Sequence, residues 1–179
     1  MLTIGDKFPE FHLTAVQGTN PDTAFKPMSN ADIKGKWACF FFWPKDFTFV
    51  CPTEIAEFNK LAGEFKDRDC VLVGGSTDSD FVHLNWQKSH SDLNNMKFPW
   101  ISDIKRELCE GLGILDKNAG VALRATFIVD PEGIIQFATV NPLKVGRNPQ
   151  EVVRVLDALQ TEELCACNRP VGADTLKAA

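Results

Sequence analysis

Residues 37–54 read WACFFFWPKDFTFVCPTE, and a strand, a loop and a helix follow one another within them. Trp37–Trp43 is a continuous apolar run rich in aromatic side chains, which predicts a strand buried on both faces. Pro44 ends this run. Beyond Pro52, apolar residues return at the spacing of one helix face: Ile55, Phe58, Ala62 and Phe65. Cys51 therefore falls in or near the first turn of the helix, directly after the loop.

The chain beyond this helix continues to alternate between strand and helix patterns. Cys70–Gly75 predicts a second buried strand. Residues 79–91 predict a helix, for which Asp78 or Ser79 is a suitable N-cap.

The next part of the sequence predicts a short helix and a hairpin. The helix runs through 105–112, and Ser102 is the residue expected to cap it. Thr126–Asp130 and Ile134–Ala138 are rich in β-formers and flank Pro131-Glu132-Gly133, a three-residue turn with glycine. These two strands are therefore expected to pair antiparallel.

The last helix has the clearest start signal. Asn148 can cap it, Pro149 suits its first position, and Glu151 stands where the acid of a capping box belongs. Its apolar face is Val152, Val155, Leu156 and Leu159. At the other end of the chain, residues 17–31 are polar and rich in turn formers, so we expect a long surface connection there.

This order of elements predicts an α/β protein. Alternating strands and helices imply parallel pairing in the first half, and the hairpin adds antiparallel strands. A mixed central sheet with helices on both faces results, and a thioredoxin-like arrangement satisfies it. We expect one such domain over residues 1–164, followed by a weakly structured tail, 165–179, that starts with two cysteines.

Composition and charge exclude several classes of function. The chain has 179 residues, 44% of them hydrophobic, and a net charge of −5. Without a basic run, nucleic acid is not expected as a partner. Without about 18 consecutive apolar residues, a membrane span is not expected either. Residues 1–6 lack the pattern of a signal peptide, so we expect a cytoplasmic protein with reduced thiols.

Six cysteines need an explanation in such a chain: Cys39, Cys51, Cys70, Cys109, Cys165 and Cys167. Cys39 and Cys70 lie in predicted apolar strands and are expected to be core thiols, and Cys109 is expected in the core or at an interface. Cys165 and Cys167 have the spacing of half a metal site, but no second pair lies at zinc-like spacing. We therefore expect no metal and no cofactor.

The position of Cys51 favours redox chemistry. The start of a helix has unpaired N–H groups and a positive dipole end, so cysteines there ionise more readily than free cysteine. The thiolate is the nucleophilic form. Thr48, three residues earlier, can donate a hydrogen bond to the sulfur or to a developing oxyanion. Aromatic neighbours can exclude water: Phe42, Trp43, Phe47 and Phe49.

At these residues the sequence resembles the peroxiredoxin family. The family pattern Pro-x-x-x-Thr-x-x-Cys is met by Pro44, Thr48 and Cys51, and the flanking FTFVCPTE is the form of typical 2-Cys members. Arg124, in LRATFIVD, matches the active-site arginine of the family. The resemblance covers essentially the whole chain. It is strongest to the alkyl hydroperoxide reductase C branch, in which a Cys-x-Cys pair follows the last helix.

The resemblance implies a thiol peroxidase. The Cys51 thiolate would attack a hydroperoxide, with Thr48 and Arg124 holding the peroxide and Pro44 shaping the pocket. The resulting sulfenic acid would form a disulfide with a thiol from the other subunit of a homodimer. Cys165 aligns with the residue that supplies this thiol, and Cys167 is an additional candidate, so the choice between them stays open.

Further expectations concern partners and supporting residues. The resemblance implies a dithiol reductant protein, alkylhydroperoxidase D-like or thioredoxin-like, and a ring of five or six dimers. Glu54 is expected to support the arginine or the helix start, and surface or structural roles are expected for His12, His83 and His90.

A thioredoxin-type disulfide reductase is the first alternative function, but Glu54 stands where its second cysteine would be. A holdase chaperone is the second alternative.

Overall fold

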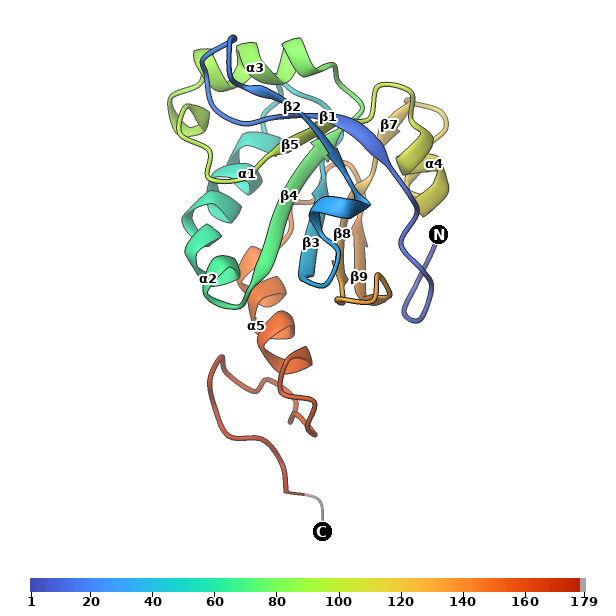
Figure 1. The fold of residues 1–179 in the computed structure, drawn as a ribbon, viewed down its shortest axis with the longest axis vertical. Helices are drawn as coiled ribbons and strands as arrows, with labels where there is room; N and C mark the ends of the chain where they lie inside the picture. Colours follow the sequence, from blue (N-terminus) through green and yellow to red (C-terminus); the bar gives the residue numbers. More distant parts are fainter. Residues whose placement is uncertain (178–179) are drawn as a thin grey trace.

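Strand β3 (Trp37–Phe42) lies inside the main sheet of the molecule, as its apolar sequence predicts. The computed structural model describes residues 1–177, and seven strands form this sheet in the order β2-β1-β5-β4-β3-β8-β9 (Figure 1). β3 pairs in parallel with β4 (Cys70–Ser76) and antiparallel with β8 (Arg124–Val129). The predicted α/β class with a mixed sheet is therefore confirmed.

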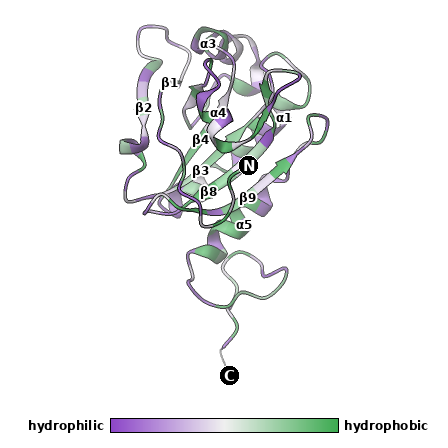
Figure 2. Ribbon diagram, turned by 90° about the vertical axis from the view of Figure 1, so that its right-hand side faces the viewer, coloured by the Kyte–Doolittle hydropathy of each residue, from purple (hydrophilic) through white to green (hydrophobic). Residues whose placement is uncertain are grey.

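Alternate side chains of β3 enter two separate cores. On one face Phe40 stacks on Phe8, with ring centroids 4.4 Å apart. On the other face Phe41 stacks on Phe58, with centroids 3.9 Å apart. Because both faces are buried, the strand needs an apolar residue at every position rather than at every second one. Figure 2 shows the hydrophobic residues concentrated in these central strands.

Helices cover both faces of the sheet in a thioredoxin-like arrangement. Helix α4 (Glu107–Leu112) contributes to the core around Phe40. The core around Phe41 is covered by four helices: α1 (Cys51–Lys60), α2 (Ala62–Asp67), α3 (Asp80–Ser89) and α5 (Pro149–Leu159). None of the helices within residues 1–177 has the length and apolar character needed to cross a bilayer.

The remaining elements complete the sheet and its connections. They are β1 (His12–Val16), β2 (Phe25–Ser29), η1 (Asn30–Asp32), η2 (Ser91–Leu93), β5 (Trp100–Ser102), β6 (Leu115–Asp116), β7 (Val121–Ala122) and β9 (Ile135–Asn141). β8 and β9 form the predicted antiparallel hairpin, with an irregularity in register after Ile128. β9 is the last strand on its side of the sheet.

The surface connection predicted for residues 17–31 is wrong over a third of its length. Phe25–Ser29 forms strand β2, which pairs antiparallel with β1 from Val16 opposite Phe25. β2 is an edge strand and contributes only Met28 to the buried core. Pro27 is tolerated because one side of an edge strand needs no ladder hydrogen bonds. A single buried residue and a proline leave no alternating pattern to recognise.

Two of the predicted helix caps are confirmed. The Ser79 hydroxyl accepts a hydrogen bond from Val82 N at 3.3 Å at the start of α3, and Asn148 accepts one from Gln150 N at 3.1 Å at the start of α5. The capping box predicted with Glu151 is not formed, because that carboxylate instead accepts two hydrogen bonds from Arg154.

The cap predicted for the short helix is also wrong. Ser102 is the last residue of β5, and its hydroxyl donates to Asp78 O at 2.7 Å. The next residue does the capping: the Asp103 carboxylate accepts from Leu108 N at 3.2 Å and from Cys109 N at 2.8 Å. A carboxylate satisfies two first-turn N–H groups at once and suits the positive end of the helix.

The tail after residue 164 has no helix or named strand within residues 165–177, yet it is fixed to the body at two places. Buried Arg169 donates to the Asp157 carboxylate of α5 at 2.7 Å, and Leu176 N donates to Leu164 O at 2.8 Å. Figure 1 shows this part of the chain extending away from the sheet beyond the end of α5.

Candidate active site at the start of helix α1

Cys51 is the first residue of α1 and is only 1% exposed. The N-cap, Val50, offers no side chain to the helix end, and Pro52 has no N–H to donate. The positive end of the helix dipole is therefore free to act on the sulfur, where it favours negative charge.

Thr48 lies directly against this sulfur. Its hydroxyl oxygen is 3.0 Å from Cys51 Sγ and 2.9 Å from the carbonyl oxygen of Lys45. The hydroxyl has one proton, so it can donate to only one of these acceptors at a time. When Cys51 is a thiolate, donation to the sulfur is the favoured choice, because hydrogen bonds to charged groups are stronger.

Arg124 approaches the sulfur from the sheet. It is the first residue of β8, is buried, and places Nη1 3.5 Å from Cys51 Sγ. Its Nε donates to Leu143 O at 2.8 Å, which fixes the plane of the guanidinium. The structure thus brings together three of the predicted site residues, and buried Pro44 begins the loop that holds Thr48.

Glu54 holds two guanidinium groups in the same cluster. Its carboxylate accepts from Arg124 Nη1 at 2.5 Å, and from Arg147 Nε at 2.8 Å, Nη2 at 3.2 Å and backbone N at 2.8 Å. Burial acts to raise the pKa of Glu54, but the hydrogen bonds and charge of Arg147, together with the charge of Arg124, outweigh it and lower the pKa. Glu54 is therefore an anion that orients Arg124, as predicted.

Arg147 is a site residue that the sequence did not reveal. Its guanidinium also donates to Ala125 O at 2.7 Å and lies over the Phe41 ring, 5.5 Å from the centroid. Arg147 directly precedes the predicted cap Asn148. That signal located the start of α5, but a local pattern does not say which way the preceding side chain points.

A buried ion pair anchors the loop that carries Thr48. The Asp46 carboxylate accepts from Trp43 Nε1 at 2.7 Å and lies 2.7 Å from His83 Nδ1, while His83 Nε2 lies 3.2 Å from Ile101 O. A carbonyl can only accept, so Nε2 carries a proton. We assign an imidazolium–carboxylate pair, in which Nδ1 donates to Asp46 Oδ2 while Asp46 Oδ1 accepts from Trp43.

The pKa of each partner reflects this environment. Burial lowers the pKa of His83, but the charge and hydrogen bond of Asp46 outweigh it, and the net pKa is raised. Burial also raises the pKa of Asp46, against the opposing effect of His83. The structural role expected for His83 is confirmed, although the sequence did not connect it to the loop.

The AhpC/TSA family matches residues 4–138. The chain belongs to the AhpC/TSA family. It is 53% identical to alkyl hydroperoxide reductase C of Mycolicibacterium smegmatis, over 99% of this chain and 95% of that protein.

Two solved structures show the same fold. Mycobacterium bovis AhpC superposes with a TM-score of 0.86 at 51% identity, covering 94% of this chain and 98% of that chain. The reduced 2-Cys peroxiredoxin of Plasmodium vivax superposes with a TM-score of 0.91 at 33% identity, covering 99% of this chain and 94% of that chain. The resemblance of this AhpC/TSA family member to peroxiredoxins is therefore confirmed.

The structure does not place Cys165 or Cys167 at this site. Both follow α5, and Figure 1 shows that segment beyond the end of the sheet, away from the start of α1. Cys165 is half-buried, with Sγ 3.4 Å from Thr161 Oγ1 and 3.8 Å from Ala158 O. Cys167 is exposed.

The other three cysteines of this AhpC/TSA chain are core thiols, as predicted. Cys39, Cys70 and Cys109 are buried. Burial raises the pKa of each of these thiols. The charge of Cys70 raises the pKa of Cys39 further, and the charge and hydrogen bond of Asp103 raise the pKa of Cys109 further. Such thiols are poor nucleophiles at neutral pH.

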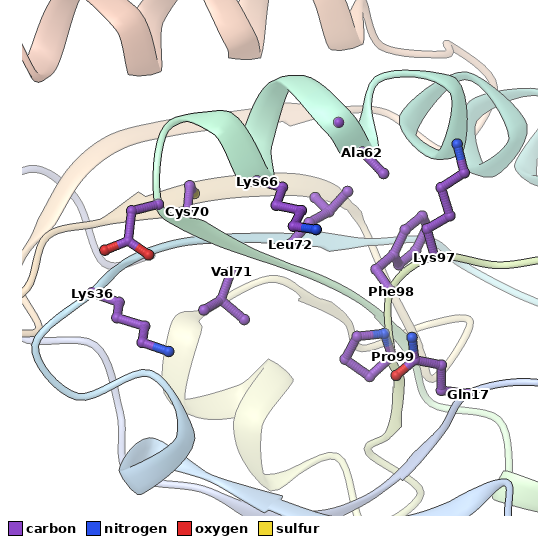
Figure 3. A pocket seen from close by; sticks show the side chains of 12 residues that line it. Gln17, Lys36, Ala62, Lys66, Cys70, Val71, Leu72, Lys97, Phe98 and Pro99 are labelled. Carbon is purple, nitrogen blue, oxygen red and sulfur yellow. The ribbon is translucent and has the colours of Figure 1, made fainter.

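Cys70 illustrates why a cysteine beside a hollow is not automatically reactive. It lines a hollow of about 540 Å³ together with Lys36 and Lys66, and Figure 3 shows these side chains around the apolar Leu72. Even so, burial and the charge of Asp69 raise the pKa of Cys70 to about 12. No member of the Cys51 site lines this hollow.

Proposed function

We propose that the chain is a thiol-dependent peroxidase that reduces hydrogen peroxide and organic hydroperoxides, with the Cys51 sulfur as the attacking atom. The observation that carries this proposal is the convergence of the Thr48 hydroxyl at 3.0 Å and the Arg124 guanidinium at 3.5 Å on one sulfur at a helix start. Membership of the AhpC/TSA family and relatives named alkyl hydroperoxide reductase support it.

The first half of the reaction uses these three residues. The Cys51 thiolate attacks the terminal peroxide oxygen, an S–O bond forms, and the O–O bond breaks. The leaving oxygen takes a proton and departs as water or alcohol, while Cys51 becomes a sulfenic acid. Thr48 and Arg124 donate hydrogen bonds to the peroxide oxygens as negative charge develops on them. Pro44 shields the site, and Glu54 keeps Arg124 in position.

The second half requires a thiol from elsewhere. Cys165 or Cys167 condenses with the sulfenic acid, so that an S–S bond forms, the S–O bond breaks and water leaves. Since the tail lies away from Cys51 within one chain, a second copy supplies this thiol. Cys51 is 1% exposed, so the first turn of α1 has to open before the sulfurs meet.

The proposal extends to partners and location. Strand β9 is at the edge of the sheet, where an identical strand of a second copy can pair with it in a homodimer. We propose that five or six such dimers form a ring. The reductant is a dithiol protein, alkylhydroperoxidase D-like or thioredoxin-like, and the site of action is the cytoplasm.

Peroxide consumption with a dithiol reductant tests the proposal. Cys51→Ser should abolish turnover, because no other described cysteine combines a helix start with two donors. Cys70→Ala is the matched control and should keep it. Mass mapping after one equivalent of peroxide should find Cys51 joined to Cys165 or Cys167. Turnover that persists in Cys51→Ser would overturn the proposal.

A further inference from the structure

One residue of the loop before Cys51 has an unusual backbone conformation. Phe47, directly before Thr48, has a φ of 55°, in the left-handed region that bulky residues rarely adopt. The Phe47 side chain is largely exposed, so burial of its ring does not enforce this conformation. Such a conformation persists only where surrounding contacts hold it. The residue on the other side of Phe47, Asp46, supplies those contacts.

The backbone of Asp46 is held by a second carboxylate, that of Asp78. Asp78 Oδ2 accepts a hydrogen bond from Asp46 N at 2.9 Å. The side chain of Asp46 is held separately, by Trp43 Nε1 and by His83 Nδ1, each at 2.7 Å. Both the backbone and the side chain of Asp46 are therefore fixed, immediately before the left-handed residue.

Asp78 is in turn fixed by the ends of two strands. Ser76 is the last residue of β4 and is buried, and its hydroxyl donates to Asp78 Oδ2 at 2.7 Å and accepts from Asp78 N at 3.0 Å. The hydroxyl of Ser102, at the end of β5, donates to Asp78 O at 2.7 Å. Asp78 thus connects the sheet to the loop that carries Thr48, and no hydrogen bond joins it to Cys51 among residues 1–177.

We propose that Asp78 is a positioning residue for the attack of Cys51 on peroxide, and that it acts through Thr48. By holding Asp46 N, the Asp78 carboxylate keeps Phe47 left-handed. This conformation directs the Thr48 hydroxyl to its place 3.0 Å from Cys51 Sγ. Without the anchor Phe47 relaxes to a negative φ, and the hydroxyl moves away from the sulfur. The inference rests on the proposed function, since it adds a residue to the same first step.

Stopped-flow measurement of Cys51 oxidation by hydrogen peroxide tests the inference. Asp78→Ala should slow oxidation by roughly 5- to 100-fold, since a displacement of about 1 Å can cost that much. Asp78→Asn keeps an oxygen acceptor for Asp46 N and should retain most of the parent rate. Asp130→Ala is the matched control. The Asp130 carboxylate is also half-buried and also accepts from backbone N–H groups, but in the turn between β8 and β9, so its loss should leave the rate unchanged.

A double-mutant cycle with Thr48→Val separates positioning from a general loss of structure. The rate effects of independent substitutions multiply, whereas those of residues that act through one another do not. In the Thr48→Val background, Asp78→Ala should therefore slow oxidation by less than about twofold further. Rate effects that multiply, no slowing by Asp78→Ala, or equal slowing by Asp78→Ala and Asp78→Asn would each overturn the inference.

Alkylation gives a second readout that needs no peroxide. Iodoacetamide is added at several pH values, and peptide mass spectrometry follows Cys51. Because the Thr48 hydroxyl stabilises the thiolate, the pH of half-maximal alkylation should rise in Asp78→Ala and should rise no further in the double variant Thr48→Val/Asp78→Ala than in Thr48→Val. An unchanged profile in Asp78→Ala would overturn the inference. If this shift appeared but peroxide did not oxidise Cys51 in the parent, the proposed function would be wrong and the positioning of Thr48 by Asp78 would stand.

Discussion

At the scale of single residues, the Cys51 sulfur completes a charge balance. Arg124 and Arg147 supply two buried cations, and Glu54 supplies one anion that both of them bind. A Cys51 thiolate is the second anion, and it brings the cluster to neutrality. Buried charges are tolerated when they are paired in this way.

Thr48 is expected to affect the first chemical step alone. Thr48→Val removes a hydrogen bond to a charged sulfur, a loss of about 1.5–3 kcal/mol, or roughly 10- to 150-fold in rate. Stopped-flow measurement of Cys51 oxidation by peroxide checks this. Thr48→Ser should stay near the parent rate. Thr53→Val is a control, since that hydroxyl donates to Val50 O on the exposed side of the helix.

Glu54→Gln is expected to destabilise the fold in a pH-dependent way. The pKa of Glu54 is lowered in the folded state, so its contribution is complete above the unfolded value of about 4.3 and is lost as pH falls through the folded value. Removing one partner of a buried pair costs about 3–5 kcal/mol. Urea unfolding should show this deficit at pH 7 and a smaller one at pH 3.5.

The control for that measurement is an exposed glutamate on the same helix. Among residues 1–177, Glu57 pairs with Lys60 alone, at 3.0 Å, and Lys60 is largely exposed. Glu57→Gln should therefore change the unfolding free energy by less than about 0.5 kcal/mol. A deficit in Glu54→Gln that stays constant between the two pH values would contradict the assignment of Glu54 as a buried anion.

At the scale of elements, the loop that carries Thr48 depends on helix α3, although the described residues of α3 make no hydrogen bond to the Cys51 sulfur. Asp46 ties the loop to His83 of α3, and Ser79 caps that helix. The position of Thr48 is thus fixed from two sides, by the start of α1 and by α3. Packing of α3 against the sheet is therefore part of the geometry at Cys51.

His83→Gln should weaken the fold most at low pH. The pKa of His83 is raised above its unfolded value of about 6.5, so its contribution is complete below that pH and is lost as pH rises through the folded value. Breaking this buried pair should cost about 3–5 kcal/mol at pH 6 and less at pH 9, as measured by urea unfolding. His90→Gln is the control, and a His83→Gln deficit that grows with pH would refute the ion pair.

The same elements show what the sequence could predict. Cys51 and Thr48 lie three residues apart, so a local motif locates both of them together with the helix start. The Asp46–His83 and Glu54–Arg147 pairs span 37 and 93 residues. Periodicity and capping rules describe neighbours along the chain, so they cannot pair side chains across such separations. Strand β2 escaped prediction for a related reason, because its partner β1 defines it more than its own residues do.

At the scale of the whole molecule, the proposed catalytic cycle uses more than one chain. Cys51 is buried at the start of α1, whereas Cys165 and Cys167 lie on a segment that extends beyond α5 and is fixed there by the Arg169–Asp157 pair. Strand β9 offers an edge for a second copy. Because a disulfide within one chain would require the tail to cross the molecule, we propose that the disulfide forms between chains.

This arrangement predicts disulfide-linked dimers after oxidation. One equivalent of peroxide should convert the chain to a dimer on a non-reducing denaturing gel, and neither Cys51→Ser nor the double variant Cys165→Ser/Cys167→Ser should form it. Mixing those two inactive proteins should recover the linked dimer, because each supplies the sulfur that the other lacks. If the oxidised parent instead ran as a monomer whose mass map showed Cys51 joined to its own tail, the tail would have to cross the molecule, and the intermolecular mechanism would be wrong.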